Sequence, residues 1–161
     1  MTIYGSYCNI DINEWGGRES VQLIVRDIKP SKQQLSVFKQ ERERFEEIKN
    51  GATFSAEEDI LPSRSDFAAV YKLMLSSYRS GIDTLSHRDI ICRMKNPEEG
   101  INIGYIKLKI IIMVFKELNI LSIEDVGEEV YKFKIHYSST KTMLDKSTLL
   151  RRIRSQMHRN D

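Results

Sequence analysis

The stretch that decides the fold is NEWGGRESVQLIVRDIKP, residues 13–30. Its Gly16-Gly17 pair supplies positions that accept a positive φ, which a tight reversal between two strands requires. The reversal joins two extended runs, at residues 3–12 and 20–29. We therefore expect a β-hairpin near the start of the chain.

The second run of this hairpin is apolar on both of its sides. One side carries Val21, Leu23 and Val25, and the other carries Gln22, Ile24, Arg26 and Ile28. A two-stranded ribbon is only marginally stable by itself in water. We therefore expect the hairpin to belong to a larger sheet or barrel whose other strands are missing here.

A helix is predicted to follow, from about Ser31 to Lys49, with Asn50-Gly51 as its end. The mixed charges of its KQERERFEEIK segment indicate a solvated helix with one packed edge. The next residues, 50–62, are interpreted as a linker.

From residue 61 onward the sequence predicts an ordered set of elements. Ser63 and Asp66 form a capping box for a first helix. The segment IDTL, residues 82–85, is a short strand, and Ser86 with Asp89 caps a second helix. A third helix spans about residues 103–118, with Asn102 as its cap and Asn119 as its left-handed exit.

Two strands and a last helix complete the chain. ILSIE, residues 120–124, and EVYKFKIHY, residues 129–137, predict a hairpin, and a helix follows at about 146–157. Helix, strand, helix, helix and a two-stranded wing are the order of a winged helix. The expected fold class is therefore α+β.

The composition is that of a soluble globular protein, with 161 residues, 40% apolar and 30% charged. The apolar runs are too short to cross a membrane, and no secretion signal opens the chain. Cys8 and Cys92 are the only cysteines, which suits a reduced compartment. We expect a cytoplasmic protein without a membrane partner.

Residue patterns for catalysis or for a metal site are lacking in the sequence. The three histidines are scattered, and there is no phosphate-binding glycine loop and no nucleophile elbow. The acid pairs Glu98-Glu99, Glu124-Asp125 and Glu128-Glu129 are interpreted as solvated loop residues. We therefore expect neither a catalytic nor a metal-binding residue, and no cofactor, in this chain.

Basic residues suggest a nucleic-acid contact on two elements. In the predicted wing, Lys132 and Lys134 alternate with aromatic residues, so that they face solvent and could meet phosphates. Near the end of the chain, Arg151 and Arg152 belong to a stretch with six basic and two acidic residues from Lys141 onward. The third helix is apolar on most sides, which disfavours reading of bases in a major groove.

The hairpin tip offers a further candidate. Trp15 could stack on an unpaired base while Arg18 binds a phosphate. The alternative interpretation is that Trp15 covers the end of the missing sheet.

The segment DINEWGGRESVQLIVRDIKPS resembles the end of the oligonucleotide-binding (OB) fold in bacterial exonucleases of the RecJ family, especially the Firmicute forms. The similarity covers residues 9–31 and is carried by Asn13, Trp15, Gly17, Val21-Gln22-Leu23 and Asp27-Ile28-Lys29. More diffuse similarity follows at Leu61 to Met74, Val114 to Leu121 and Lys141 to Arg152. These segments resemble the extra C-terminal domain of that family.

The resemblance implies a role in DNA recombination and repair. The family removes nucleotides from the 5′ ends of single-stranded DNA, using an N-terminal phosphoesterase core with an Asp-His-His motif and Mn²⁺ or Mg²⁺. This sequence lacks that motif. The implied organisation is the last two strands of a truncated OB fold (1–30), a connecting helix and linker (31–60) and a winged-helix-like accessory domain (61–161).

The partners that follow from this resemblance are single-stranded DNA, bound weakly and without sequence preference, the catalytic core of the parent enzyme, and a repair protein. We also expect the truncated hairpin to pair with a second copy or with the accessory domain. Two alternatives stay open, a free-standing winged-helix regulator that binds duplex DNA and a protein-interaction module.

Overall fold

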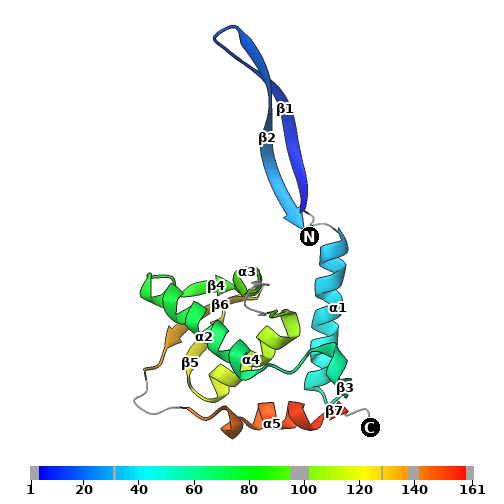
Figure 1. Ribbon diagram of the computed structural model, residues 1–161, viewed down its shortest axis with the longest axis vertical. Helices are drawn as coiled ribbons and strands as arrows, with labels where there is room; N and C mark the ends of the chain where they lie inside the picture. Colours follow the sequence, from blue (N-terminus) through cyan, green and yellow to red (C-terminus); the bar gives the residue numbers. More distant parts are fainter. Residues whose placement is uncertain (1–3, 31, 95–101, 128, 138–141, 159–161) are drawn as a thin grey trace. The chain divides into compact units, whose positions relative to one another are not determined.

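The computed structural model describes residues 4–30, 32–94, 102–127, 129–137 and 142–158. Among these residues it is a mixed α and β protein with five α-helices, two small antiparallel sheets and one short parallel strand pair (Figure 1). Residues 1–40 and 41–161 form two compact units, which are described in turn.

The first unit contains a long antiparallel ribbon, which confirms the expected hairpin. Its strands are β1 (Tyr4–Trp15) and β2 (Arg18–Pro30), which pair with each other along their whole length (Figure 1). Gly16 and Gly17 have φ values of 60° and 75°, as a two-residue turn between twisted strands requires. A bulge interrupts the register between Tyr7 and Cys8.

Helix α1 (Lys32–Lys49) follows the ribbon, and its end at Lys49 is the predicted one, whereas the predicted first residue, Ser31, lies outside the described residues. Its last turns belong to the second unit. There Phe45 and Ile48 are buried, while the residues between them are exposed. This confirms a solvated helix with one packed edge.

The segment after α1, which we interpreted as a linker, has structure of its own. It contains β3 (Phe54–Ser55) and the 3₁₀ turn η1 (Ala56–Glu58). β3 pairs in parallel with β7 (Met157–His158), near the end of the chain. The side chains of Phe54 and Ile60 are buried, so this segment contributes to the core.

The centre of the second unit is a three-stranded sheet with helices against it. Its elements are α2 (Arg64–Arg79), β4 (Thr84–Ser86), α3 (His87–Met94), α4 (Tyr105–Glu117), β5 (Leu121–Asp125) and β6 (Val130–Ile135). The strand order is β4-β6-β5, and both pairings are antiparallel. The three helices pack on one another, and α2 and α4 also contact the sheet.

Local signals predicted these elements well, with one exception. Ser63 and Asp66 form the capping box of α2, Ser86 and Asp89 bond in the same manner before α3, and Asn119 has a φ of 52°. Helix α4, however, begins at Tyr105 with Gly104 as its N-cap, so the expected cap at Asn102 is wrong. Gly104 is extended there, with a φ of −83°.

Helix α4 is the most buried element of the second unit. Its buried side chains are Tyr105, Lys107, Leu108, Ile110, Ile111, Ile112, Val114 and Phe115. The apolar ones belong to a core to which α2, β6 and α5 (Thr148–Ser155) also contribute, with Val70, Met74, Phe133, Leu150 and Ile153. The 3₁₀ turn η3 (Leu144–Lys146) leads into α5, whose N-cap is Ser147.

Candidate functional site

The hairpin tip places two of the predicted binding residues next to each other. Trp15 and Arg18 are register partners on either side of the two-glycine turn. Arg18 is exposed, whereas the side chain of Trp15 lies outside the described part of the structure. A cation at an exposed turn is available to a phosphate.

The wing lysines lie on the solvent side of the sheet, as predicted. Lys132 and Lys134 are exposed, and Tyr131, Phe133 and Ile135 between and beside them are buried. Lys132 stands opposite Glu124 of β5, which offsets its charge, whereas Lys134 stands opposite Ser122. Lys134 is therefore the better candidate of the two for a phosphate.

The predicted arginines of α5 are exposed but also hold the fold together. Arg152 Nη2 donates to the carbonyl of Lys49 at 3.3 Å, and Arg151 Nε donates to the carbonyl of Ser147 at 3.5 Å. The two lysines lie on β6 and the two arginines on α5, whereas Trp15 and Arg18 lie on β1 and β2 of the first unit. Among the described residues of the second unit, no hydrogen bond or ion pair joins the two lysines to the two arginines.

Sequence reasoning missed a polar cluster around Glu129, which comprises Arg42, His87, Tyr105, Lys109, Glu129 and Tyr131. The Oε1 atom of Glu129 accepts from the Tyr105 hydroxyl and from Arg42 Nη2 at 3.0 Å. Lys109 Nζ lies 3.4 Å from the same oxygen. The expectation of a solvated loop acid is therefore wrong for Glu129, whose side chain is only 20% exposed.

His87 is a buried member of the Glu129 cluster that contacts Tyr105, Glu129 and Tyr131. Its Nδ1 lies 3.0 Å from the Tyr131 hydroxyl, its ring packs on Tyr105 at a centroid distance of 4.5 Å, and its backbone N–H donates to the Glu129 carbonyl at 2.8 Å. The Lys109 ammonium lies over the rings of Tyr105 and Tyr131, at 5.7 and 5.3 Å. No local spacing in the sequence signals this cluster, because its members come from α1, α3, α4, β6 and the turn before β6.

The electrostatics of the Glu129 cluster follow from burial and from the charges of its members. Burial, helped by the positive charge of Lys109, lowers the pKa of His87 to about 4. Burial opposes ionisation of Glu129, but the hydrogen bonds from Tyr105 and Arg42 and the charge of Lys109 outweigh it, so its pKa is lowered. Burial raises the pKa values of Tyr105 and Tyr131. At neutral pH the cluster therefore holds a neutral imidazole and an ionised carboxylate.

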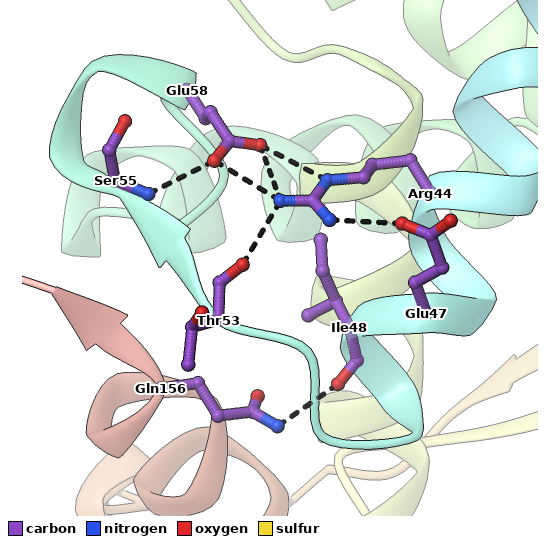
Figure 2. A network of polar contacts seen from close by, with 7 residues as sticks. All are labelled: Arg44, Glu47, Ile48, Thr53, Ser55, Glu58 and Gln156. Atoms are coloured by element: carbon purple, nitrogen blue, oxygen red, sulfur yellow. Dashed lines mark hydrogen bonds and ion pairs between the residues drawn. The ribbon is translucent and has the colours of Figure 1, made fainter.

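A second polar network joins the end of α1 to the segment that follows it, as Figure 2 shows. The Arg44 guanidinium binds Glu58 with Nη2 at 2.8 Å and Nε at 3.1 Å, and donates to the Thr53 carbonyl at 3.1 Å and to Glu47 at 2.9 Å. Nearby, Gln156 Nε2 donates to the Ile48 carbonyl at 3.1 Å. This network fixes the last turn of α1 to both β3 and the end of α5.

Two lysines of α4 form ion pairs with acidic residues of the second unit. Lys107 forms an ion pair with Asp59 at 2.6 Å and lies 3.8 Å from Asp66, and Lys109 belongs to the Glu129 cluster. Among the lysines of α4, only Lys116, at the C-terminal end, is exposed. The helix therefore lacks the row of exposed polar side chains with which a reading helix contacts bases.

A cavity of about 900 Å³ opens beside α2 and the end of α4. Its apolar wall includes Phe67, Tyr71 and Phe115, and Arg64, His136 and Asp145 add polar groups. The size and the mixed lining are those of a site for a small molecule or a peptide side chain.

An Mn²⁺ or Mg²⁺ ion, which the resemblance implies for the parent enzyme, would need a group of carboxylate or imidazole ligands. Among the described residues, no group of three or more His, Cys, Asp or Glu side chains could hold a metal ion. The described residues therefore do not fit an Mn²⁺ or Mg²⁺ site. None of the described helices is long and apolar enough to cross a membrane.

The comparisons with known proteins give no match: no family model, no curated protein and no solved structure is similar to this chain.

Proposed function

We propose that this chain is a non-catalytic C-terminal part of a RecJ-like exonuclease in DNA recombination and repair, which assists the binding of single-stranded DNA or of a repair partner. The β1–β2 ribbon is the observation that carries this proposal. Its Ile10, Ile12 and Val21 side chains are 74%, 64% and 72% exposed. Apolar exposure of this extent on paired strands is typical of a surface that another layer or further strands cover.

The register of the ribbon supports the same proposal. Ile12 is paired with Val21, and Ile10 with Leu23, so apolar positions meet across the two strands. In the proposed parent, the remaining strands of an OB fold would cover them. In the isolated chain, a second copy is the proposed substitute, and light scattering at high concentration would show a dimer. A strict monomer would count against this pairing.

The second unit supports a winged-helix-like accessory domain. From α2 to β6 its order is helix, strand, helix, helix, strand, strand, and the first strand pairs with the last. In this arrangement α4 would be the reading helix and β5–β6 the wing. Burial of α4, however, argues against a free-standing regulator that reads a duplex. Arg18 and Lys134 are exposed cations, so weak contacts with phosphates agree better with the structure than the reading of bases by α4 does.

A fluorescence titration with labelled single-stranded oligonucleotide tests the proposal. Trp15→Ala and Arg18→Ala should each weaken binding, by about fivefold or more for the tryptophan, because base stacking contributes about 1–3 kcal/mol. Arg79→Ala, which removes an exposed arginine at the end of α2, is the matched control. Unchanged affinity in both hairpin variants would exclude the tip from the binding surface.

A protein-interaction module is the second candidate, and the cavity beside α2 favours it. An apolar wall with a few polar groups accepts a side chain of a partner protein. Selection from a random pool of duplexes separates this candidate from a duplex-binding regulator. Enrichment of one duplex sequence would support the regulator and would contradict both other proposals.

A further inference from the structure

The carboxylate of Glu129 lies where three donors of different kinds converge. Its Oε1 atom accepts hydrogen bonds from the Arg42 guanidinium of α1 and from the Tyr105 hydroxyl, and it forms an ion pair with the Lys109 ammonium of α4. Guanidinium, ammonium and hydroxyl groups are also the donors with which proteins bind a phosphate oxygen. Arg42, Tyr105 and Lys109 therefore form an anion site, and the chain's own Glu129 occupies it.

The backbone of this occupant is held in an unfavourable conformation. Glu129 has a φ of 61°, in the left-handed region that residues with a side chain rarely adopt. Backbone hydrogen bonds of the turn between β5 and β6 account for this φ, because the Val130 N–H donates to the Gly127 carbonyl and the Val126 N–H donates to the Val130 carbonyl, both at 2.9 Å. The His87 N–H also donates to the Glu129 carbonyl at 2.8 Å, so the backbone of Glu129 is held independently of its carboxylate.

The charges of the site favour a replacement by another anion. Arg42 and Lys109 are two cations and Glu129 is one anion, so the site keeps a net positive charge while it is occupied. The Arg42 side chain is 61% exposed, whereas those of Lys109 and Glu129 are 16% and 20% exposed. An incoming anion would therefore meet the arginine first and the lysine after Glu129 has moved.

We infer that Arg42, Tyr105 and Lys109 bind a backbone phosphate of single-stranded nucleic acid, in exchange for the carboxylate of Glu129. The choice of nucleic acid as the source of the phosphate rests on the proposed function. The site itself rests on the convergence of the three donors on one carboxylate oxygen and on the exposure of Arg42. Glu129 acts here as an internal competitor, which keeps the affinity of the free chain low.

The test measures the salt dependence of oligonucleotide binding for Glu129→Gln. This change removes the charge but preserves the size of the side chain. Each additional phosphate bound by a cation steepens the plot of log K against log salt by about 0.7 for a single strand. We expect E129Q to steepen the plot by about that amount and to bind labelled oligothymidylate several-fold more tightly at low salt. Glu57→Gln, which removes an exposed carboxylate of η1, is the matched control.

Reversal in a double variant identifies the residues responsible. In E129Q/R42Q the slope should return to that of the wild-type chain. An E129Q slope equal to that of E57Q would overturn the site, because a purely structural carboxylate changes stability and not the number of phosphates bound. If E129Q does not fold by circular dichroism, Glu129→Gly takes its place, because glycine accepts the φ of 61° and the change also removes the carboxylate. An E129G slope steeper than that of E57Q, restored in E129G/R42Q, supports the site, and an E129G slope equal to that of E57Q overturns it.

The outcomes also separate this inference from the proposed function. If W15A or R18A loses binding and E129Q has no effect, the hairpin tip stays part of the binding surface and the anion site is overturned. A gain in E129Q with no effect of W15A or R18A would support the anion site and remove the hairpin from the binding surface. No response in any of these variants would contradict both.

Discussion

Aliphatic side chains are exposed in the ribbon of the first unit and buried in the core of the second unit. In the ribbon, Ile10 and Ile12 are mostly exposed, whereas Ile110 and Ile111 of α4 have no exposed surface. Burial of an aliphatic side chain stabilises a fold by about 1.5–3 kcal/mol, which the exposed isoleucines do not contribute within this chain. The second unit is therefore stabilised by its own core, and the apolar residues of the ribbon are available to another surface.

The largest expected effect comes from truncation of the α4 core. Leu108→Ala removes a fully buried side chain and should lower the free energy of unfolding by about 2–5 kcal/mol, because the cavity is only partly refilled. Ile10→Ala in the ribbon should change it by about 0.5 kcal/mol or less. Urea denaturation monitored by circular dichroism measures both. A comparable loss in the two variants would contradict the contrast between the units.

Much of the fold could be predicted from the sequence, because short-range signals specify it. Gly16-Gly17 determines the hairpin, the serine–aspartate pairs determine two helix starts, and the alternation in β6 determines which side is buried. These features depend on neighbours a few residues apart. The buried character of α4 was predicted for the same reason, from its continuous apolar run.

The Glu129 cluster and the role of residues 50–62 could not be predicted. Glu129 is near Arg42, Tyr105 and Lys109 only after α1, α4 and the wing have packed, and an acidic pair beside a turn usually points to solvent. Likewise, Phe54 is buried because β7 comes from the opposite end of the sequence. Long-range packing of this kind leaves no periodic trace in one sequence.

The second largest expected effect is a loss of stability in mild acid, caused by His87. Its pKa is about 4 in the fold, below the value of about 6.5 in an unfolded chain, so the unfolded state binds the proton more readily. The contribution of neutral His87 is fully present above about pH 6.5 and is lost as the pH falls toward 4. The free energy of unfolding should decrease by roughly 2–3 kcal/mol over that window.

Urea denaturation at several pH values tests this for the wild-type chain and His87→Gln. The groups that face His87 are Tyr131, Tyr105, Lys109, Glu129 and Arg42, and they stay in both proteins. The difference in stability between the two proteins should therefore shrink between pH 6.5 and 4.5. His136→Gln, at the end of β6, is the matched control. A constant difference for H87Q would show that His87 is not the group that titrates.

The smallest effect concerns Arg44, whose hydrogen bonds to Glu47, Thr53 and Glu58 lie within the second unit. Arg44→Gln removes the bidentate contact with Glu58 and the bond to the Thr53 carbonyl, and should cost about 1 kcal/mol. Lys49→Gln, which breaks the exposed pair with Glu46, should cost only about 0.3 kcal/mol. Hydrogen exchange should accelerate at the amides of residues 54–58 and stay unchanged in the ribbon, since β1 and β2 bond only to each other among the described strands. Faster exchange in the ribbon would mean that the network at the end of α1 also supports the first unit, and the separation of the two units would have to be abandoned.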